Sequence, residues 1–212
     1  MFNVLTANLP YLLRGAIITL WMALIVVTLG TLLGVGLGII AAVGGRALRA
    51  LITGYIFVLR GIPVLVVMFL GYYAFPAMGY RVNAYVAVGL AQIIYVSAFA
   101  AEIVRSAILS VPSGQIAAAK GLGMRRLSIL LQVVLPQATR IAIPPLLNNA
   151  LTAVKQTSYA SVVGAWELTY AAREVVERTL ASFQIFLGVM AIYFAICYPL
   201  SLFAGWCEKR LK

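Results

Sequence analysis

The polar side chains that could bind a small molecule lie within long apolar stretches of this sequence. The richest stretch, residues 141–165, carries Asn149, Thr152 and Gln156 at spacings of three and four, followed by Ser158. On a helix the first three share one face. Polar groups at membrane depth are expensive and mark binding sites or pathways by default. We therefore predict that these four residues bind a substrate near the middle of a membrane, with hydrogen bonding between neighbouring helices as the alternative.

Four charged residues fall within or at the ends of the same apolar stretches. Glu102 and Arg105 are three residues apart, so they can form an ion pair across one helical turn. Arg60 could extend its charge to water, neutralise Glu102 or meet a substrate carboxylate, and the sequence leaves these three roles open. We expect Arg60, Glu102, Arg105 and Lys155 to form an intramembrane ion pair or a gate, the ion pair being favoured for Glu102 and Arg105.

The residue types in this sequence give little support for a catalytic or metal-binding site. The chain has no His, which is the commonest catalytic base and metal ligand. Cys197 and Cys207 are ten residues apart and lack the spacing of a metal or redox motif. The glycines at 34, 36 and 38 have no Gly-Lys-Ser/Thr after them, so we interpret Gly34 and Gly38 as helix-packing positions. We predict no catalytic residue, metal site or cofactor on this chain. If ATP drives this protein, another chain must bind it.

The elements that position these residues follow from composition. Apolar residues make up 64% of the chain and charged residues only 10%, which is typical of a membrane protein. A helix needs about 20 apolar residues to cross the hydrocarbon core. We predict an all-α, polytopic membrane protein whose residues 1–212 form one domain with five transmembrane helices. The spans are expected at about 15–43, 51–74, 82–104, 141–165 and 183–206, after a short amphipathic segment at residues 1–14.

The basic residues indicate an orientation. Short cytoplasmic loops concentrate Lys and Arg, and these residues cluster after the first span, between the third and fourth spans and at the carboxyl end. The amino terminus is therefore predicted outside and the carboxyl terminus inside. The net charge of +11 is explained by this asymmetry and by lipid headgroups, so nucleic acid is not expected as a partner.

The basic loop at residues 111–136 is predicted to contact another protein. It contains a short helix at residues 114–120, closed by Gly121 and Gly123, and a second amphipathic helix that is expected to stop at Pro136. Three small side chains at residues 117–119 would allow close docking, and Lys120 could reach an acidic rim. A solvated surface helix is the alternative interpretation.

The spacing of this loop resembles the "EAA" loop of permease subunits in ATP-binding-cassette (ABC) importers, in which EAA, three residues, Gly, nine residues and I-x-L-P follow in order. Here Ala117-Ala118-Ala119, Gly123 and Val133-Val134-Leu135-Pro136 take those places, with Ala117 where the family carries Glu. The resemblance implies that the loop couples the permease to a separate ATPase. The residues to which it gives this role are Gly114, Gln115, Ala117, Ala118, Ala119, Lys120, Gly121 and Gly123.

Other elements resemble the polar amino-acid permeases, the histidine/glutamine/glutamate/arginine permease-like family. Arg60-Gly61-Ile62-Pro63 resembles "RGTP", and residues 101–106 resemble "AEIxRG" with Ser106 in place of Gly. Residues 135–146 resemble "LPQAxRxxxPPL", and residues 155–169 resemble "KDTSLASxxGxxELT". The resemblance covers about residues 50–172 and implies the type I importer permease fold.

A member of this family would be a non-catalytic subunit that forms half of an amino-acid import pathway in the bacterial cytoplasmic membrane. The implied partners are a second permease subunit, identical or related, two ATPase subunits that bind ATP, an extracytoplasmic solute-binding protein, the amino acid and membrane lipid. In members with cationic substrates, carboxylates often replace Asn149 and Gln156, so the amides here favour a polar neutral or acidic amino acid. A standard second subunit in a heterodimer could supply the Glu that Ala117 lacks.

Two questions stay open at this point. A self-sufficient ion-coupled carrier or channel is the alternative function, although Glu102 is the only clear intramembrane acid for it. The outer loop at residues 166–182 is expected to form an amphipathic helix that either meets the solute-binding protein or merely anchors at the headgroups through Trp166. Its other polar residues are Glu167, Arg173, Glu174, Glu177 and Arg178.

Overall fold

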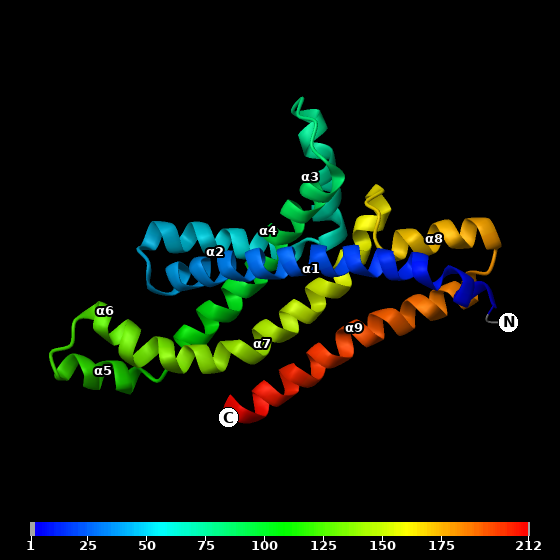
Figure 1. The fold of residues 1–212 in the computed structure, drawn as a ribbon. Helices are drawn as coiled ribbons and strands as arrows, with labels where there is room; N and C mark the ends of the chain where they lie inside the picture. The colour runs from blue at the N-terminus through cyan, green and yellow to red at the C-terminus, as the bar shows by residue number, and fades with distance from the viewer. Residues whose placement is uncertain (1–2, 212) are drawn as a thin grey trace.

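The computed structural model describes residues 3–211, which are helical apart from short connections and contain no strand (Figure 1). The all-α prediction is therefore confirmed. The α-helices are α1 (Asn3–Val43), α2 (Arg46–Gly61), α3 (Val64–Ala77), α4 (Ala84–Leu109), α5 (Ser113–Gly121), α6 (Arg126–Ile129), α7 (Leu135–Gln156), α8 (Leu168–Thr179) and α9 (Ser182–Leu211). A π-helical turn at Leu130–Val134 precedes α7, and a 3-10 helix at Thr157–Val163 follows it.

Four helical segments of the described chain are long and apolar enough to cross a membrane: Asn3–Val43, Ala84–Leu109, Arg126–Val163 and Ser182–Arg210. A fifth candidate arises if α2 and α3 together form one span, although they meet at an angle of 106°. The predicted span at 51–74 is thus not a straight helix. Pro63 forces Ile62 into an extended conformation (φ −108°, ψ 134°), which ends α2 and starts α3 in a new direction.

The first helix is longer than the sequence indicates. Residues 3–14 do not form a separate amphipathic segment, because α1 runs unbroken from Asn3 to Val43, and residues 1 and 2 lie outside the described residues. Burial explains the extension: Leu12 is fully buried against Leu168 of α8 and Ile185 of α9. At about 1.5 Å per residue, such a helix is longer than the hydrocarbon core is thick.

Glycines allow α1 to pack closely on α4. A Cβ added at Gly34 would lie 2.5 Å from Ala100 Cβ, and one at Gly38 would lie 2.5 Å from the Ala101 carbonyl oxygen. Neither distance is compatible with a side chain, so the predicted packing role is confirmed. In lipid this close contact, rather than a hydrophobic driving force, holds the two helices together.

The second helix of the 111–136 loop does not stop at Pro136. It continues through the π-helical turn into α7, so one helical rod extends from Arg126 to Gln156. In the π turn the Leu135 N–H bonds the Leu130 carbonyl, five residues back. The wider turn and the position of Pro136 at the start of α7 avoid the clash that makes proline a helix stop.

The two ends of the molecule are distinct. The amino-terminal end of α1 lies with α8 and the start of α9 at one end, whereas α5 and α6 lie at the other (Figure 1). This is the separation that the predicted orientation requires between an outer loop and a cytoplasmic loop.

Candidate functional site

The short helix of the loop, α5, has well-defined ends. It begins after Pro112, which caps it, and the chain leaves it through Gly123 at a φ of +77°. The Gly123 N–H bonds the Lys120 carbonyl at 2.9 Å, and the Met124 N–H bonds the Ala119 carbonyl at 3.1 Å. This pair of bonds is a Schellman cap, which requires a left-handed residue and therefore favours glycine. The turn role predicted for Gly123 is confirmed, whereas Gly121 lies within the helix and has no positive φ.

One face of α5 is a flat exposed strip of Gly114, Ala117, Ala118 and Gly121. A Cβ added at either glycine would meet no atom within 4 Å, so nothing in the described chain covers the strip. Ala119 does not belong to it, contrary to the predicted docking set, because this side chain is only 5% exposed and packs against Ile108, Ile129 and Val134. Helical periodicity accounts for the difference, since Ala119 points away from its two neighbours.

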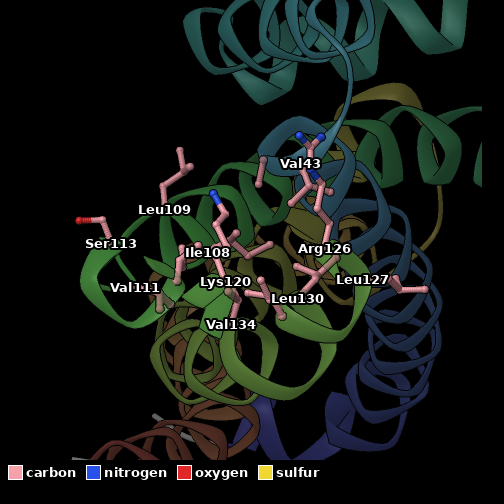
Figure 2. A pocket seen from close by; sticks show the side chains of 13 residues that line it. Val43, Ile108, Leu109, Val111, Ser113, Lys120, Arg126, Leu127, Leu130 and Val134 are labelled. Carbon is pink, nitrogen blue, oxygen red and sulfur yellow. The ribbon is translucent and has the colours of Figure 1, made fainter. Parts of the chain in front are cut away.

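Two contacts attach α5 rigidly to the membrane helices. The buried Ala119 joins the cluster that contains the ends of α1 and α4, and the Gln115 Oε1 accepts a 2.6 Å hydrogen bond from Gln137 Nε2 at the start of α7. These contacts connect α5 to α1, α4 and α7. Lys120 is exposed and lies beside a cavity between α5 and the ends of α1 and α4 (Figure 2).

The predicted ion pair in α4 is confirmed. Arg105 donates from Nε and Nη2 to the two carboxylate oxygens of Glu102 at 2.9 and 2.8 Å, and the Ser106 hydroxyl donates at 3.2 Å. Arg60 approaches the same carboxylate at 3.9 Å and stacks its guanidinium over the ring of Phe99. Lys155 does not join this group, and within residues 3–211 it has no ion pair.

A cavity of about 410 Å³ lies beside this charge cluster. Arg60, Glu102, Ser106 and Ser110 line it on one side, and Ile141 and Pro145 of α7 line it on the other. Two guanidinium groups share one carboxylate here, so one positive charge is left without a carboxylate partner. The position of the cavity between α4 and α7 makes it a candidate part of a pathway.

The polar residues of α7 and the following 3-10 helix largely bond to the protein itself. Asn149 Nδ2 donates to the Val96 carbonyl of α4 at 3.4 Å, Thr152 donates to its own helix, and Ser158 donates to the Lys155 carbonyl. Gln156 is half-buried. None of the four lines the described cavities, so their role in substrate binding stays a prediction.

The sequence reasoning missed Gln92, which is fully buried between α4 and α7. Its Nε2 donates to the Ala153 carbonyl at 3.0 Å, and its Oε1 has no hydrogen-bond partner in the described chain. The available signal was an isolated amide in the apolar 82–104 stretch. A buried acceptor without a partner is costly, which places Gln92 among the candidate pathway residues.

The amphipathic helix predicted in the outer loop is present as α8, but one of the charged residues expected there is buried. Glu167 is fully buried and caps α8: its Oε1 accepts from the Tyr170 N–H at 2.9 Å, and its Oε2 accepts from Thr19 Oγ1 at 3.1 Å and from the Tyr193 hydroxyl at 3.2 Å. Burial raises the pKa of the Glu167 carboxyl, against the lowering effect of its hydrogen bonds. This carboxyl joins α1, α8 and α9, so it is not free for a partner.

The other polar residues of the loop divide into two groups. Trp166 Nε1 and the Tyr11 hydroxyl both donate to a Glu174 carboxylate oxygen, which fixes this part of the loop to α1. The side chains that remain exposed are Arg173, Glu177 and Arg178.

Comparison with known proteins agrees with this architecture. The family model described as "Binding-protein-dependent transport system inner membrane component" matches residues 34–212. The chain belongs to that family. It is 35% identical over 210 residues to the probable glutamine ABC transporter permease protein GlnM of Bacillus subtilis, covering 99% of this chain and 97% of the relative. It is 39% identical over 167 residues to the L-cystine transport system permease protein TcyB of the same organism, covering 78% and 71%.

Solved structures support the same assignment for this permease. The crystal structure of an amino acid ABC transporter with histidines matches with a TM-score of 0.93 at 30% identity, covering 99% of this chain and 98% of that chain. An inward-facing structure of the MetNI methionine ABC transporter matches with a TM-score of 0.79 at 18% identity and shows the shared fold. The chain is therefore an amino-acid ABC transporter permease of the importer type, a multi-pass protein of the bacterial cytoplasmic membrane.

Proposed function

We propose that this permease forms one half of the pathway of an ATP-driven importer for a polar neutral or acidic amino acid, with glutamine the first substrate to test. Several relatives are named as glutamine permeases, including GlnM and the glutamine transport system permease protein GlnP of Escherichia coli. The neutral amides Asn149 and Gln156 support the same substrate class, because a cationic substrate would favour carboxylates there.

The exposed strip on α5 is the observation that carries the coupling role. Its four positions have no side chain larger than a methyl group, and nothing in the described chain covers them. A partner ATPase that binds ATP could approach this strip at backbone distance. The Gln115–Gln137 hydrogen bond and the buried Ala119 would then transmit its movement to α7 and α4. In this proposal a second permease subunit completes the pathway, and a solute-binding protein delivers the amino acid from outside.

The predicted carrier alternative receives no comparable support. An ion-coupled carrier needs an acid that can bind and release its ion inside the membrane. Glu102 is held by Arg105 through two short hydrogen bonds, and Glu167 is buried in a hydrogen-bond network at the α8 end. The named relatives are ABC permeases, which favours the importer.

The test is uptake in proteoliposomes that contain this permease with its ATPase and solute-binding protein. ATP-dependent glutamine uptake that persists when ion gradients are collapsed would support the proposal. Uptake that needs an ion gradient but no ATPase would overturn it.

Ala118→Arg tests the strip directly. The added charge would be desolvated against the ATPase, so we expect ATP hydrolysis without coupled uptake. The control is Gln132→Arg, which places the same side chain at an exposed position of the π turn, outside α5. Equal uptake in the two variants would remove the coupling role from the strip.

A further inference from the structure

A cavity of about 580 Å³ lies where α5 meets the ends of α1 and α4 (Figure 2). Its walls are apolar and include Ile116 of α5 and Leu130 of the π turn. Three apolar side chains at its edge are also exposed: Val43 by 51%, Leu109 by 58% and Leu127 by 65%. Val43 and Leu109 stand at the ends of two spans, so this edge lies near the membrane surface. Exposed apolar groups at that depth are suited to contact with lipid rather than water.

Two cations extend from the same cavity. Figure 2 shows the nitrogen ends of Lys120 and Arg126 reaching to one side of it, away from Val134 at its base. Neither makes an ion pair with another residue in the described part of the chain, and no acidic residue is among those that line the cavity. Arg49 adds a third positive charge close by, since it donates to the carbonyl of the lining residue Ala42 at 3.1 Å.

The cavity is separate from the strip proposed for the ATPase. Ser113, Ile116 and Lys120 of α5 line the cavity, and their spacings of three and four place them on one face of the helix. The strip occupies a different face, centred on Ala117, Ala118 and Gly121. A partner bound to the strip would therefore leave the cavity available to another ligand.

We propose that this cavity binds one anionic phospholipid of the cytoplasmic leaflet. An acyl chain would lie against the apolar walls, and the headgroup phosphate would bind Lys120 and Arg126. Apolar burial together with charge-assisted hydrogen bonds to phosphate is the chemistry that the two parts of the cavity offer. Basic pockets at the cytoplasmic ends of membrane helices recognise anionic headgroups in this way. The site does not depend on which amino acid is transported.

The experiment measures lipid retention by the full chain alone, so it is independent of transport. The purified permease is stripped in detergent, offered phosphatidylglycerol or phosphatidylcholine, and examined by native mass spectrometry. We expect one tightly retained phosphatidylglycerol and no retained phosphatidylcholine. The variant K120Q/R126Q should bind phosphatidylglycerol with an affinity lower by at least about tenfold. Val43→Trp, which fills the edge of the cavity without changing charge, should also weaken retention.

The matched control is R125Q/R140Q, which removes the same charge from exposed residues that do not line the cavity. It should retain phosphatidylglycerol as the unmodified chain does. Equal loss in the two double variants, or equal retention of the two lipids, would overturn the proposal. So would a K120Q/R126Q variant that keeps the lipid but loses the ATPase in a pull-down, because the cavity would then serve the ATPase. Circular dichroism checks that every variant keeps its helical content.

Discussion

Replacing Glu167 by Ala should destabilise the end of the molecule that contains α8. The carboxylate caps α8 and accepts hydrogen bonds from Thr19 of α1 and Tyr193 of α9. Losing the cap costs about 1 kcal/mol. The two hydroxyls keep a second neighbour each, Gly15 for Thr19 and Thr169 for Tyr193, so together they add about 1 kcal/mol. The space left by the deleted side chain adds about 1–2 kcal/mol.

The total of about 3–4 kcal/mol corresponds to a fall in melting temperature of roughly 6–16 °C for a chain of this size. The assay is thermal unfolding in detergent, followed by intrinsic tryptophan fluorescence, to which Trp166, adjacent to the substituted residue, contributes together with Trp21 and Trp206. Glu177→Ala is the control, because Glu177 is exposed on the same helix and its loss should change stability by no more than about 0.5 kcal/mol. A Glu167→Ala variant that melts with the control would refute the structural role of the buried carboxylate.

The same carboxylate should make stability depend on pH. Its pKa is raised by burial from the ordinary value of 4.5, so the folded chain holds this proton to a higher pH than the unfolded chain does. The corresponding stabilisation is complete below pH 4.5 and is lost as pH rises through the raised pKa. Glu167→Gln, which cannot titrate, should remove that decline from a series of melting curves. A decline of equal size in Glu167→Gln would assign the pH dependence to other groups.

Four further substitutions have direct outcomes. Gly34→Val should lower the melting temperature and separate α1 from α4, because its Cβ would lie 2.5 Å from Ala100 Cβ. Overpacking of this kind costs about 1–3 kcal/mol, and an unchanged melting temperature would contradict the close packing. Gly123→Val should weaken coupled uptake, since a β-branched residue resists the φ of +77°; normal ATPase assembly and uptake would count against a fixed α5 cap. Asn149→Ala and Gln156→Ala should each lower ATP-driven uptake far more than they lower the melting temperature. Each deletion would leave a polar group of the bound substrate without a hydrogen-bond partner, which costs about 1–3 kcal/mol of binding free energy. Loss of melting temperature with intact uptake would instead indicate helix packing.

The features that the sequence predicts well depend on local spacing. Glu102 and Arg105 form the ion pair that their separation of three residues indicates. The cap at Gly123 has a positive φ, and glycine is the residue type that adopts this conformation readily. The apolar stretches likewise predict most of the spans, because backbone hydrogen bonding in lipid leaves few alternatives to a helix.

The features that the sequence does not predict depend on contacts between distant segments. In the sequence Glu167 has the context of an exposed residue, but in the fold its carboxylate accepts a hydrogen bond from Thr19, 148 residues away. The buried position of Ala119 depends on how α5 folds back on α4, and the passage of the helix through Pro136 depends on a π turn that no residue type specifies. In each case a local rule for exposure or helix termination is overridden by packing that the sequence does not display.

The π turn also controls where the far end of its helix points. Compared with a regular α-helix, it carries one surplus residue, and one residue corresponds to about 100° of rotation about the helix axis. The two halves of the rod are therefore out of phase by that angle. Deleting Leu131 would restore regular winding, and every side chain of α7 would turn by about a quarter of a revolution. Asn149 would then leave the Val96 carbonyl that it faces on α4. The direction in which this side chain points is therefore fixed by a single extra residue some five turns away.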